Sequence, residues 1–144
     1  MKKITFATLI SLFLFSCIGS SKLSQSGSKE KDIVKNLIDL MILGDETQMN
    51  EQYRPLISPK YIKENDINID DYKINYYSPK SYTIESYDAK TGKIEAKIWG
   101  NNKTWAHLLE FKIVKENNKL YLYPEKHTNS KYVYPWYKVT TNVE

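Results

Sequence analysis

The two histidines, His107 and His127, are the side chains best suited to acid–base chemistry near neutral pH. In a strand, His107 shares one face with Trp105 and Leu109, whereas Glu110 points to the opposite face. His107 and Glu110 therefore cannot form a catalytic dyad from one regular strand. His127 lies in a polar loop, where we expect it to be solvated. His107 stays a catalytic candidate, against the alternative of a core or rim histidine satisfied by one hydrogen bond.

Other patterns of catalytic or metal-binding residues are missing from the sequence. The two histidines are far apart and have no HxH or HxxE spacing, so we expect no metal site. The sequence has no Gly-x-Ser-x-Gly elbow of a serine hydrolase and no glycine-rich phosphate loop. We therefore predict no metal and no cofactor, and we do not expect an enzyme.

Aromatic residues late in the chain are the better candidates for binding. Tyr121 and Tyr123 alternate with Leu120 and Leu122, so they should face away from the core. Tyrosine and tryptophan supply rigid area with a polar tip, which suits contact with a protein or a glycan. The alternative is cross-strand aromatic pairing that only stabilises the sheet. The predicted binding residues are Trp105, His107, Tyr121, Tyr123, Tyr134 and Trp136, and Tyr132 and Tyr137 belong to the same aromatic set.

The first residues have the pattern of a secretion signal. Lys2 and Lys3 precede an apolar run over residues 4–15, which is too short to span a bilayer comfortably. The run ends in Leu14-Phe15-Ser16-Cys17, which resembles the lipobox of bacterial lipoproteins, with Cys17 as the lipidated first residue. The alternative is an ordinary leader that is cleaved near residues 19–21.

Lipidation of Cys17 would fix the location of the protein. Acyl chains contribute ~0.8 kcal/mol per buried CH₂, so two or three chains anchor a protein stably to a membrane. Because Cys17 is the only cysteine, its acylation would leave no thiol for a disulfide, a metal or a nucleophile. We expect a signal peptide at 1–16, a serine- and glycine-rich tether at 17–29 and one folded domain at 30–144. The expected location is the bacterial envelope, with the outer membrane preferred over the inner membrane.

Composition agrees with one small domain rich in strands. The chain has 144 residues, 41% of them hydrophobic, and its 12 tyrosines favour strands over a helical bundle. The net charge is +4, and losing Lys2 and Lys3 with the leader would lower it to +2. The lysines are scattered among acidic residues, so we expect no nucleic-acid partner.

Helical signals come first along the chain and strand signals follow. An apolar stripe over residues 33–42 predicts a helix with Ser28 as N-cap and Gly44 as its stop. Asp45 opens a second helix with Met49, Gln52 and Tyr53 on one face, and Ser58-Pro59 opens a short third. Strands are expected at 72–77, 81–87, 93–99, 105–114 and 119–123, and residues 132–137 are expected to close the sheet edge.

This order predicts an α+β fold, with two to three helices on one face of a curved antiparallel sheet of four to five strands. The amphipathic first helix, the short helix opened by residues 57–62 and the closing run 105–124 resemble the NTF2-like (SnoaL-like, cystatin-superfamily) cone of small envelope lipoproteins. The resemblance covers roughly residues 30–137. It implies a hollow between sheet and helices, where enzymatic relatives hold an Asp/His pair; the candidates here are His107, Glu110, Asp39 and Asp45.

The preferred function is a lipid-anchored envelope lipoprotein that binds a ligand or a protein without catalysis. One alternative is a small pocket enzyme of isomerase or hydratase type, with His107 as its acid or base. Another is an immunity or inhibitor lipoprotein that blocks a toxin or a hydrolase with its aromatic edge. The expected partners are a membrane, through acylated Cys17, and a protein or small molecule.

Overall fold

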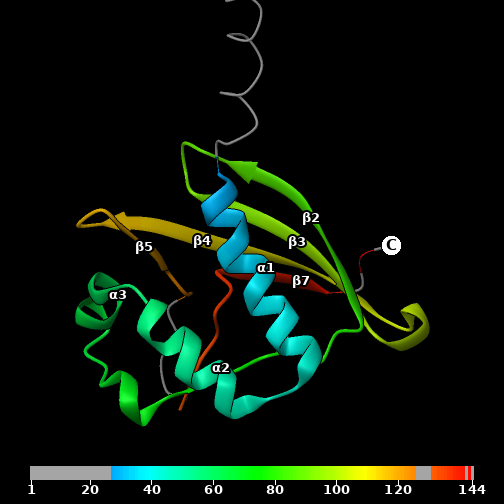
Figure 1. Cartoon of the computed structure of the whole chain (residues 1–144), viewed down its shortest axis with the longest axis horizontal. Helices are drawn as coiled ribbons and strands as arrows, with labels where there is room; N and C mark the ends of the chain where they lie inside the picture. Colours follow the sequence, from blue (N-terminus) through cyan, green and yellow to red (C-terminus); the bar gives the residue numbers. More distant parts are fainter. Residues whose placement is uncertain (1–26, 126–130, 142, 144) are drawn as a thin grey trace, which may run out of the picture.

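The computed structural model describes residues 27–125, 131–141 and 143, and it has an α+β fold (Figure 1). Helices α1 (Ser28–Leu43), α2 (Glu46–Tyr53) and α3 (Pro59–Glu64) precede the main sheet in sequence and pack on one of its faces. The main sheet contains β2 (Ser81–Asp88), β3 (Lys93–Trp99), β4 (Ala106–Glu116), β5 (Lys119–Leu122) and β7 (Lys138–Thr141). The predicted fold class, with three helices on a five-stranded antiparallel sheet, is confirmed.

The 11-residue strand β4 organises the sheet, as the sequence indicates. β3 pairs along one edge of β4, and two strands share the other edge. β7 pairs with residues 107–110 of that edge and β5 with residues 113–116, so β5 and β7 run end to end along β4. A register shift between Ile84 and Ser86 marks a bulge in β2, and bulges bend and twist a strand. The sheet curves around α1 and stays open (Figure 1).

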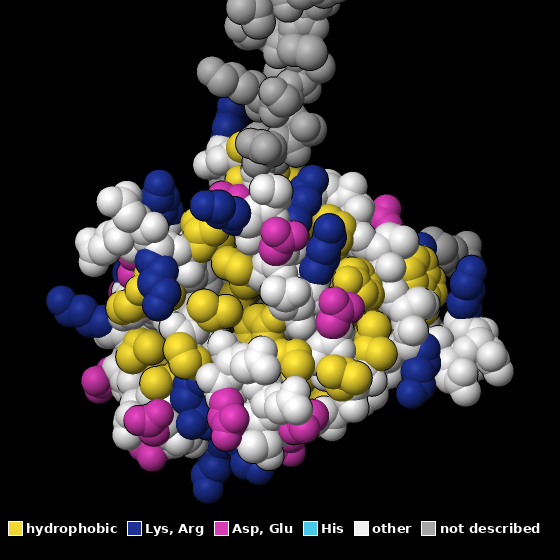
Figure 2. All heavy atoms as spheres, viewed as in Figure 1, with side chains coloured by type: hydrophobic (Ala, Val, Ile, Leu, Met, Phe, Trp, Pro, Cys, Tyr) yellow, Lys and Arg dark blue, Asp and Glu magenta, His cyan; other side chains and the backbone are white. Residues whose placement is uncertain are grey.

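The core lies between α1 and the helix-facing surface of the sheet. Leu109, Phe111 and Ile113 on β4 are buried, which confirms the predicted core face. Val34, Leu37, Ile38, Leu40 and Met41 of α1 are buried against this layer. Burying a large aliphatic or aromatic side chain contributes about 1.5–3 kcal/mol to the stability of the fold, so this layer supplies most of the driving force for folding. On the face that carries α1, apolar side chains lie among scattered charges of both signs (Figure 2).

Most predicted helix ends are confirmed. Gly44 ends α1 in the left-handed conformation (φ 71°), and the Asp45 side chain accepts a hydrogen bond from the Gln48 backbone N–H at 2.9 Å. Ser58 caps α3, whose first residue is Pro59. Two details were wrong. Ser28 is already helical, with Gly27 as the N-cap, and Gln52 is exposed rather than on the buried face with Met49 and Tyr53.

Tight turns set the registers of β3, β4 and β5. Gly92 has φ 70°, and a Cβ there would collide with the Ile113 carbonyl of β4. Asn117 and Asn118, at φ 48° and 63°, form the two-residue hairpin between β4 and β5. Asparagine tolerates the left-handed region because its short polar side chain can bond locally.

Two of the predicted strands are placed differently in the structure. Within residues 72–77 only β1 (Lys73–Ile74) is a strand, and it pairs in parallel with β6 (Tyr132–Val133) in a separate two-stranded sheet. The sequence predicted that residues 132–137 close the edge of the main sheet, and this was wrong. The strand at that edge is β7, which pairs with β4. Pro135 has no N–H to donate and Trp136 is buried in the core, so this segment cannot continue an edge ladder.

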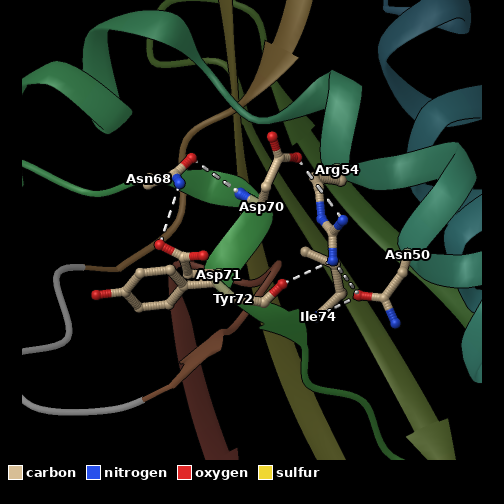
Figure 3. Close-up of polar contacts among 7 residues, drawn as sticks. All are labelled: Asn50, Arg54, Asn68, Asp70, Asp71, Tyr72 and Ile74. Carbon is tan, nitrogen blue, oxygen red and sulfur yellow. Dashed lines mark hydrogen bonds and ion pairs between the residues drawn. The ribbon is translucent and has the colours of Figure 1, made fainter.

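Arg54, the only arginine in the sequence, links α2 to β1 (Figure 3). Its Nη2 donates to the Tyr72 carbonyl at 2.8 Å, and Asn50 Oδ1 accepts from the Ile74 backbone N–H at 3.0 Å. Nη1 lies 3.8 Å from a carboxylate oxygen of exposed Asp70. Every strong contact of Arg54 is thus made within the fold, and we assign this group a structural role.

Candidate functional site

An aromatic cluster lies on the helix-facing side of the sheet, where β4 begins. It contains Tyr77, Trp105, His107, Tyr134 and Trp136. The His107 ring contacts two others, with centroids 4.7 Å from Tyr77 and 4.9 Å from Trp105, and these two rings lie 6.1 Å from each other. Tyr77 stacks on Trp136 at 5.0 Å, and Trp136 meets Tyr134 edge-on at 5.5 Å. The five rings therefore form one continuous chain of contacts.

Three parts of the chain bring these rings together. His107 is on β4, opposite Ile98 of β3 and Thr141 of β7. Trp105 immediately precedes β4 and packs against Gly100, where a Cβ would collide with the indole ring. Tyr77 follows β1, and the two late rings lie between β6 and β7. The parallel pairing of β1 with β6 is what places Tyr77 beside the late aromatic residues.

Burial differs among the five rings of the aromatic cluster. Trp136 is only 3% exposed, whereas the other four are half-buried. Burial raises the pKa of Tyr77, and neighbouring Tyr134 adds to the effect. His107 Nδ1 is buried and has no hydrogen-bond partner among the described residues. The single hydrogen bond expected for a core histidine is thus not found at Nδ1, and His107 is held by ring contacts instead.

Carboxylates are kept away from His107, as strand geometry predicts. Glu110 lies on the outer surface of the sheet, where its Oε1 is 3.0 Å from Lys93 Nζ. Asp45 caps α2. Asp39 on α1 is next to Tyr82, whose pKa is raised by burial and by that carboxylate. Within the described part of the chain, the structure therefore assembles no acid–base pair at His107.

A second site, the edge groove, lies at the edge of the sheet where β5 ends and β7 begins. It has a volume of about 550 Å³ and is lined by Tyr61, Glu64, Asn65, Tyr123, Pro124, Glu125, Tyr137 and Lys138. Next to it, Tyr123 N–H donates to the Lys112 carbonyl and Tyr137 N–H to the Glu110 carbonyl, at 2.8 and 2.6 Å. At this point the chain leaves the edge of β4 after β5, and it returns to the same edge just before β7.

Polar contacts fix the aromatic walls of the edge groove. The rings of Tyr61 and Tyr123 meet at 5.5 Å and 79°, an edge-to-face geometry. Tyr123 Oη donates to the Glu64 carboxylate, which, with burial, raises the pKa of Tyr123 to about 12. Tyr61 Oη donates to the Glu125 carbonyl at 2.9 Å. Tyr123 therefore stays protonated at neutral pH.

Lysines cover the tyrosine rings on the outer surface. Lys112 Nζ lies 4.8 Å from the ring centroid of Tyr123 and 5.2 Å from that of Tyr137. Lys93 Nζ lies 5.6 Å from the Tyr137 centroid. Such contacts contribute about 0.5–1 kcal/mol at exposed sites. These ring faces are thus already occupied by cations of the protein itself.

Ser58 fixes α3, which carries one wall of the edge groove, to the sheet. Its side chain is fully buried, donates to the Glu116 carboxylate and accepts from the Tyr61 N–H at 3.1 Å. Its backbone N–H donates to the Leu122 carbonyl at 2.8 Å. The other Glu116 oxygen accepts from the Lys60 N–H at 3.4 Å. One buried serine therefore connects α3 with both strands of the β4–β5 hairpin.

The structure separates the six predicted binding residues. It brings Trp105, His107, Tyr134 and Trp136 together in the aromatic cluster, Tyr123 lines the edge groove, and Tyr121 lies outside both sites under Lys119. Sequence reasoning missed Tyr77, Tyr61 and Glu64. The alternation in residues 72–77 was a usable signal for Tyr77, but the sequence gives no sign of its ring partners.

Cys17 and His127 lie outside the described residues. Over the described ranges, no group of three or more His, Cys, Asp or Glu side chains could hold a metal ion. Among the helices of those ranges, none combines the length and the apolar character that a membrane crossing needs.

Comparisons of the chain with protein-family models, with curated proteins and with solved structures found no match.

Proposed function

We propose that this protein is a lipid-anchored lipoprotein of the bacterial envelope whose domain binds a ligand or a protein without catalysing a reaction. The anchor rests on the sequence, in which a basic start and an apolar run lead to Cys17. We also propose that the domain is a divergent NTF2-like cone, since helices precede a curved antiparallel sheet that wraps around the first of them.

The surroundings of His107 are the observation that favours binding over catalysis. Its ring packs against Tyr77 and Trp105, and no carboxylate among the described residues hydrogen-bonds to its Nδ1. A histidine that acts as a general base is oriented, and its tautomer is set, by the hydrogen bond that its other ring nitrogen makes. An assembly of half-buried rings is instead typical of contact surfaces, where aromatic side chains are enriched.

The anchor is tested by changing Cys17. We expect Cys17→Ala to abolish acylation and to release the protein from membranes, with Ser16→Ala as a matched control that keeps a small residue before the cysteine. Metabolic labelling with a fatty acid and detergent partitioning measure both effects. Unchanged partitioning of Cys17→Ala would remove the anchor from the proposal.

The binding function is tested separately at His107. We expect His107→Phe, which keeps a ring in contact with Tyr77 and Trp105, to leave any cellular phenotype of the gene intact, because the proposal gives the imidazole no proton to transfer. A folded His107→Phe protein with the phenotype of a deletion would instead favour the pocket enzyme. Crosslinking in intact envelopes, with Trp105→Ala beside the wild type, would show whether the aromatic cluster contacts a partner.

A further inference from the structure

We propose that the edge groove binds a neutral saccharide. This inference rests on the proposed binding function and names a ligand class for it, at a site distinct from the aromatic cluster. Ligand sites are typically concavities of ~300–1,000 Å³ with a few converging polar groups, and the groove of about 550 Å³ lies within that range.

The position of the groove gives it rigid walls. One wall comes from α3, which Ser58 ties to the β4–β5 hairpin. The other comes from the residues that leave β5 and enter β7, whose backbones remain hydrogen-bonded to β4. A site supported by secondary structure on both sides loses little conformational entropy when a ligand binds.

The composition of the walls suits a ring that is apolar on one face and rich in hydroxyls at its rim. Tyr123 and Tyr137 are half-buried and supply aromatic surface, and Pro124 lies beside Tyr123. Tyr61 is only 3% exposed and supports Tyr123 through their edge-to-face contact. Glu64 accepts from Tyr123 through Oε2, while its Oε1 is 3.8 Å from the exposed Lys60 ammonium, which leaves acceptor capacity on this carboxylate.

An unsatisfied amide lies in the same wall. Asn65 Nδ2 donates to the Tyr61 carbonyl at 2.8 Å, but Asn65 Oδ1 is buried with no donor among the described residues. A buried acceptor without a partner costs about 1–3 kcal/mol. This oxygen is shielded from solvent, so a ligand hydroxyl or amide N–H would reach it only if the Asn65 side chain turned towards the groove, and that contact would recover part of the cost.

Charge balance favours a neutral ligand over an ion. Charges of both signs line the groove or lie directly beside its walls: Lys60, Lys93, Lys112 and Lys138, and Glu64, Glu110 and Glu125. A cationic ligand would meet Lys112, which already occupies faces of Tyr123 and Tyr137. An anionic ligand would meet the carboxylate of Glu64. Saccharide hydroxyls donate and accept, so they can match both kinds of group.

The test uses the full-length protein in a detergent without a sugar headgroup, because a glycoside detergent would compete for the groove. The probes are a tetramer of N-acetylglucosamine, a tetramer of glucose and, as a cation, choline. Binding is measured by titration calorimetry and by saturation-transfer NMR. We expect saturable binding of at least one tetramer and none of choline.

Variants locate the binding. We expect Tyr123→Ala to weaken the affinity at least tenfold, and the matched control Tyr121→Ala, two residues away on the same edge, to leave it unchanged. Glu64→Gln keeps a hydrogen-bond acceptor and perturbs the fold less than Tyr123→Ala does. It should weaken the affinity about threefold to tenfold. Thermal unfolding of each variant separates loss of affinity from loss of fold.

Three results would overturn the inference: binding of neither tetramer, binding of choline in their place, or equal loss of affinity in Tyr121→Ala and Tyr123→Ala. None of these results bears on Cys17 acylation or on crosslinking at the aromatic cluster. Failure of the saccharide proposal is therefore distinguishable from failure of the proposed function.

Discussion

The aromatic cluster and the edge groove both use rings, but they stabilise them in different ways. In the cluster, Tyr77 contacts both His107 and Trp136, and the buried His107 nitrogen is left without a partner among the described residues. In the groove, Tyr123 is held by a carboxylate on one side and an ammonium on another. The cluster therefore depends on packing, and the groove depends on polar contacts.

This difference separates stability from ligand chemistry. Trp136 is buried and stacks on Tyr77, so its substitution should mainly change the free energy of unfolding. Tyr123 is half-buried and lines the groove, so its substitution should mainly change affinity.

The largest effect is expected at Trp136. Trp136→Ala removes a ring that is only 3% exposed and stacks on Tyr77, so it should lower the free energy of unfolding by about 3–5 kcal/mol. Urea denaturation followed by circular dichroism measures the change. Tyr123→Ala, the corresponding change in the groove, should cost less than half as much. Equal costs would mean that the division between the two sites is wrong.

The sequence predicts the fold well because its strongest signals are local. Alternation along residues 105–114, the glycine at position 44 and the Ser58-Pro59 pair each act over a few residues, and the structure has the core strand, helix end and helix start that they indicate. The opposite orientations of His107 and Glu110 also follow from strand geometry alone. These predictions needed no knowledge of which strands pair.

The two sites depend on pairings that local patterns do not encode. The aromatic cluster exists because β1 pairs in parallel with β6, more than 50 residues later, and this brings Tyr77 to Trp136. The edge groove exists because β5 and β7 share one edge of β4. Pro135 interrupts the late segment, so periodicity placed the edge strand at residues 132–137 instead of 138–141.

The next largest effect is expected where α3 joins the sheet. Ser58→Ala removes a helix cap and leaves Glu116 without its buried donor, so it should lower the free energy of unfolding by about 2 kcal/mol. Ser58→Thr, which keeps the hydroxyl, is the matched control. Because α3 carries a groove wall, we expect Ser58→Ala also to weaken saccharide binding while hydrogen exchange in α1 stays slow. Fast exchange in both helices would show that the effect is not local.

A smaller change of opposite sign is expected at His107. His107→Phe keeps a ring against Tyr77 and Trp105 and removes the buried nitrogen that lacks a partner, so it should raise the free energy of unfolding by about 1 kcal/mol. Urea denaturation beside His107→Gln, which keeps polar atoms but loses the ring, separates the two contributions. A destabilised His107→Phe protein would indicate that His107 makes a polar contact that the ring-packing account omits.

The smallest effect is expected at Tyr123 and appears only at high pH. Its pKa is raised from 10.0 to about 12, mainly by the hydrogen bond to Glu64, so the folded protein keeps this proton after the unfolded chain has lost it. The resulting stabilisation is fully present below pH 10 and is lost as the pH rises to about 12. Tyr123→Phe lacks this contribution, so the wild-type advantage in free energy of unfolding should shrink over that interval. An advantage that stays constant with pH would mean that the Tyr123 hydroxyl is not held by the carboxylate, and the groove would lose the polar support that sets it apart from the aromatic cluster.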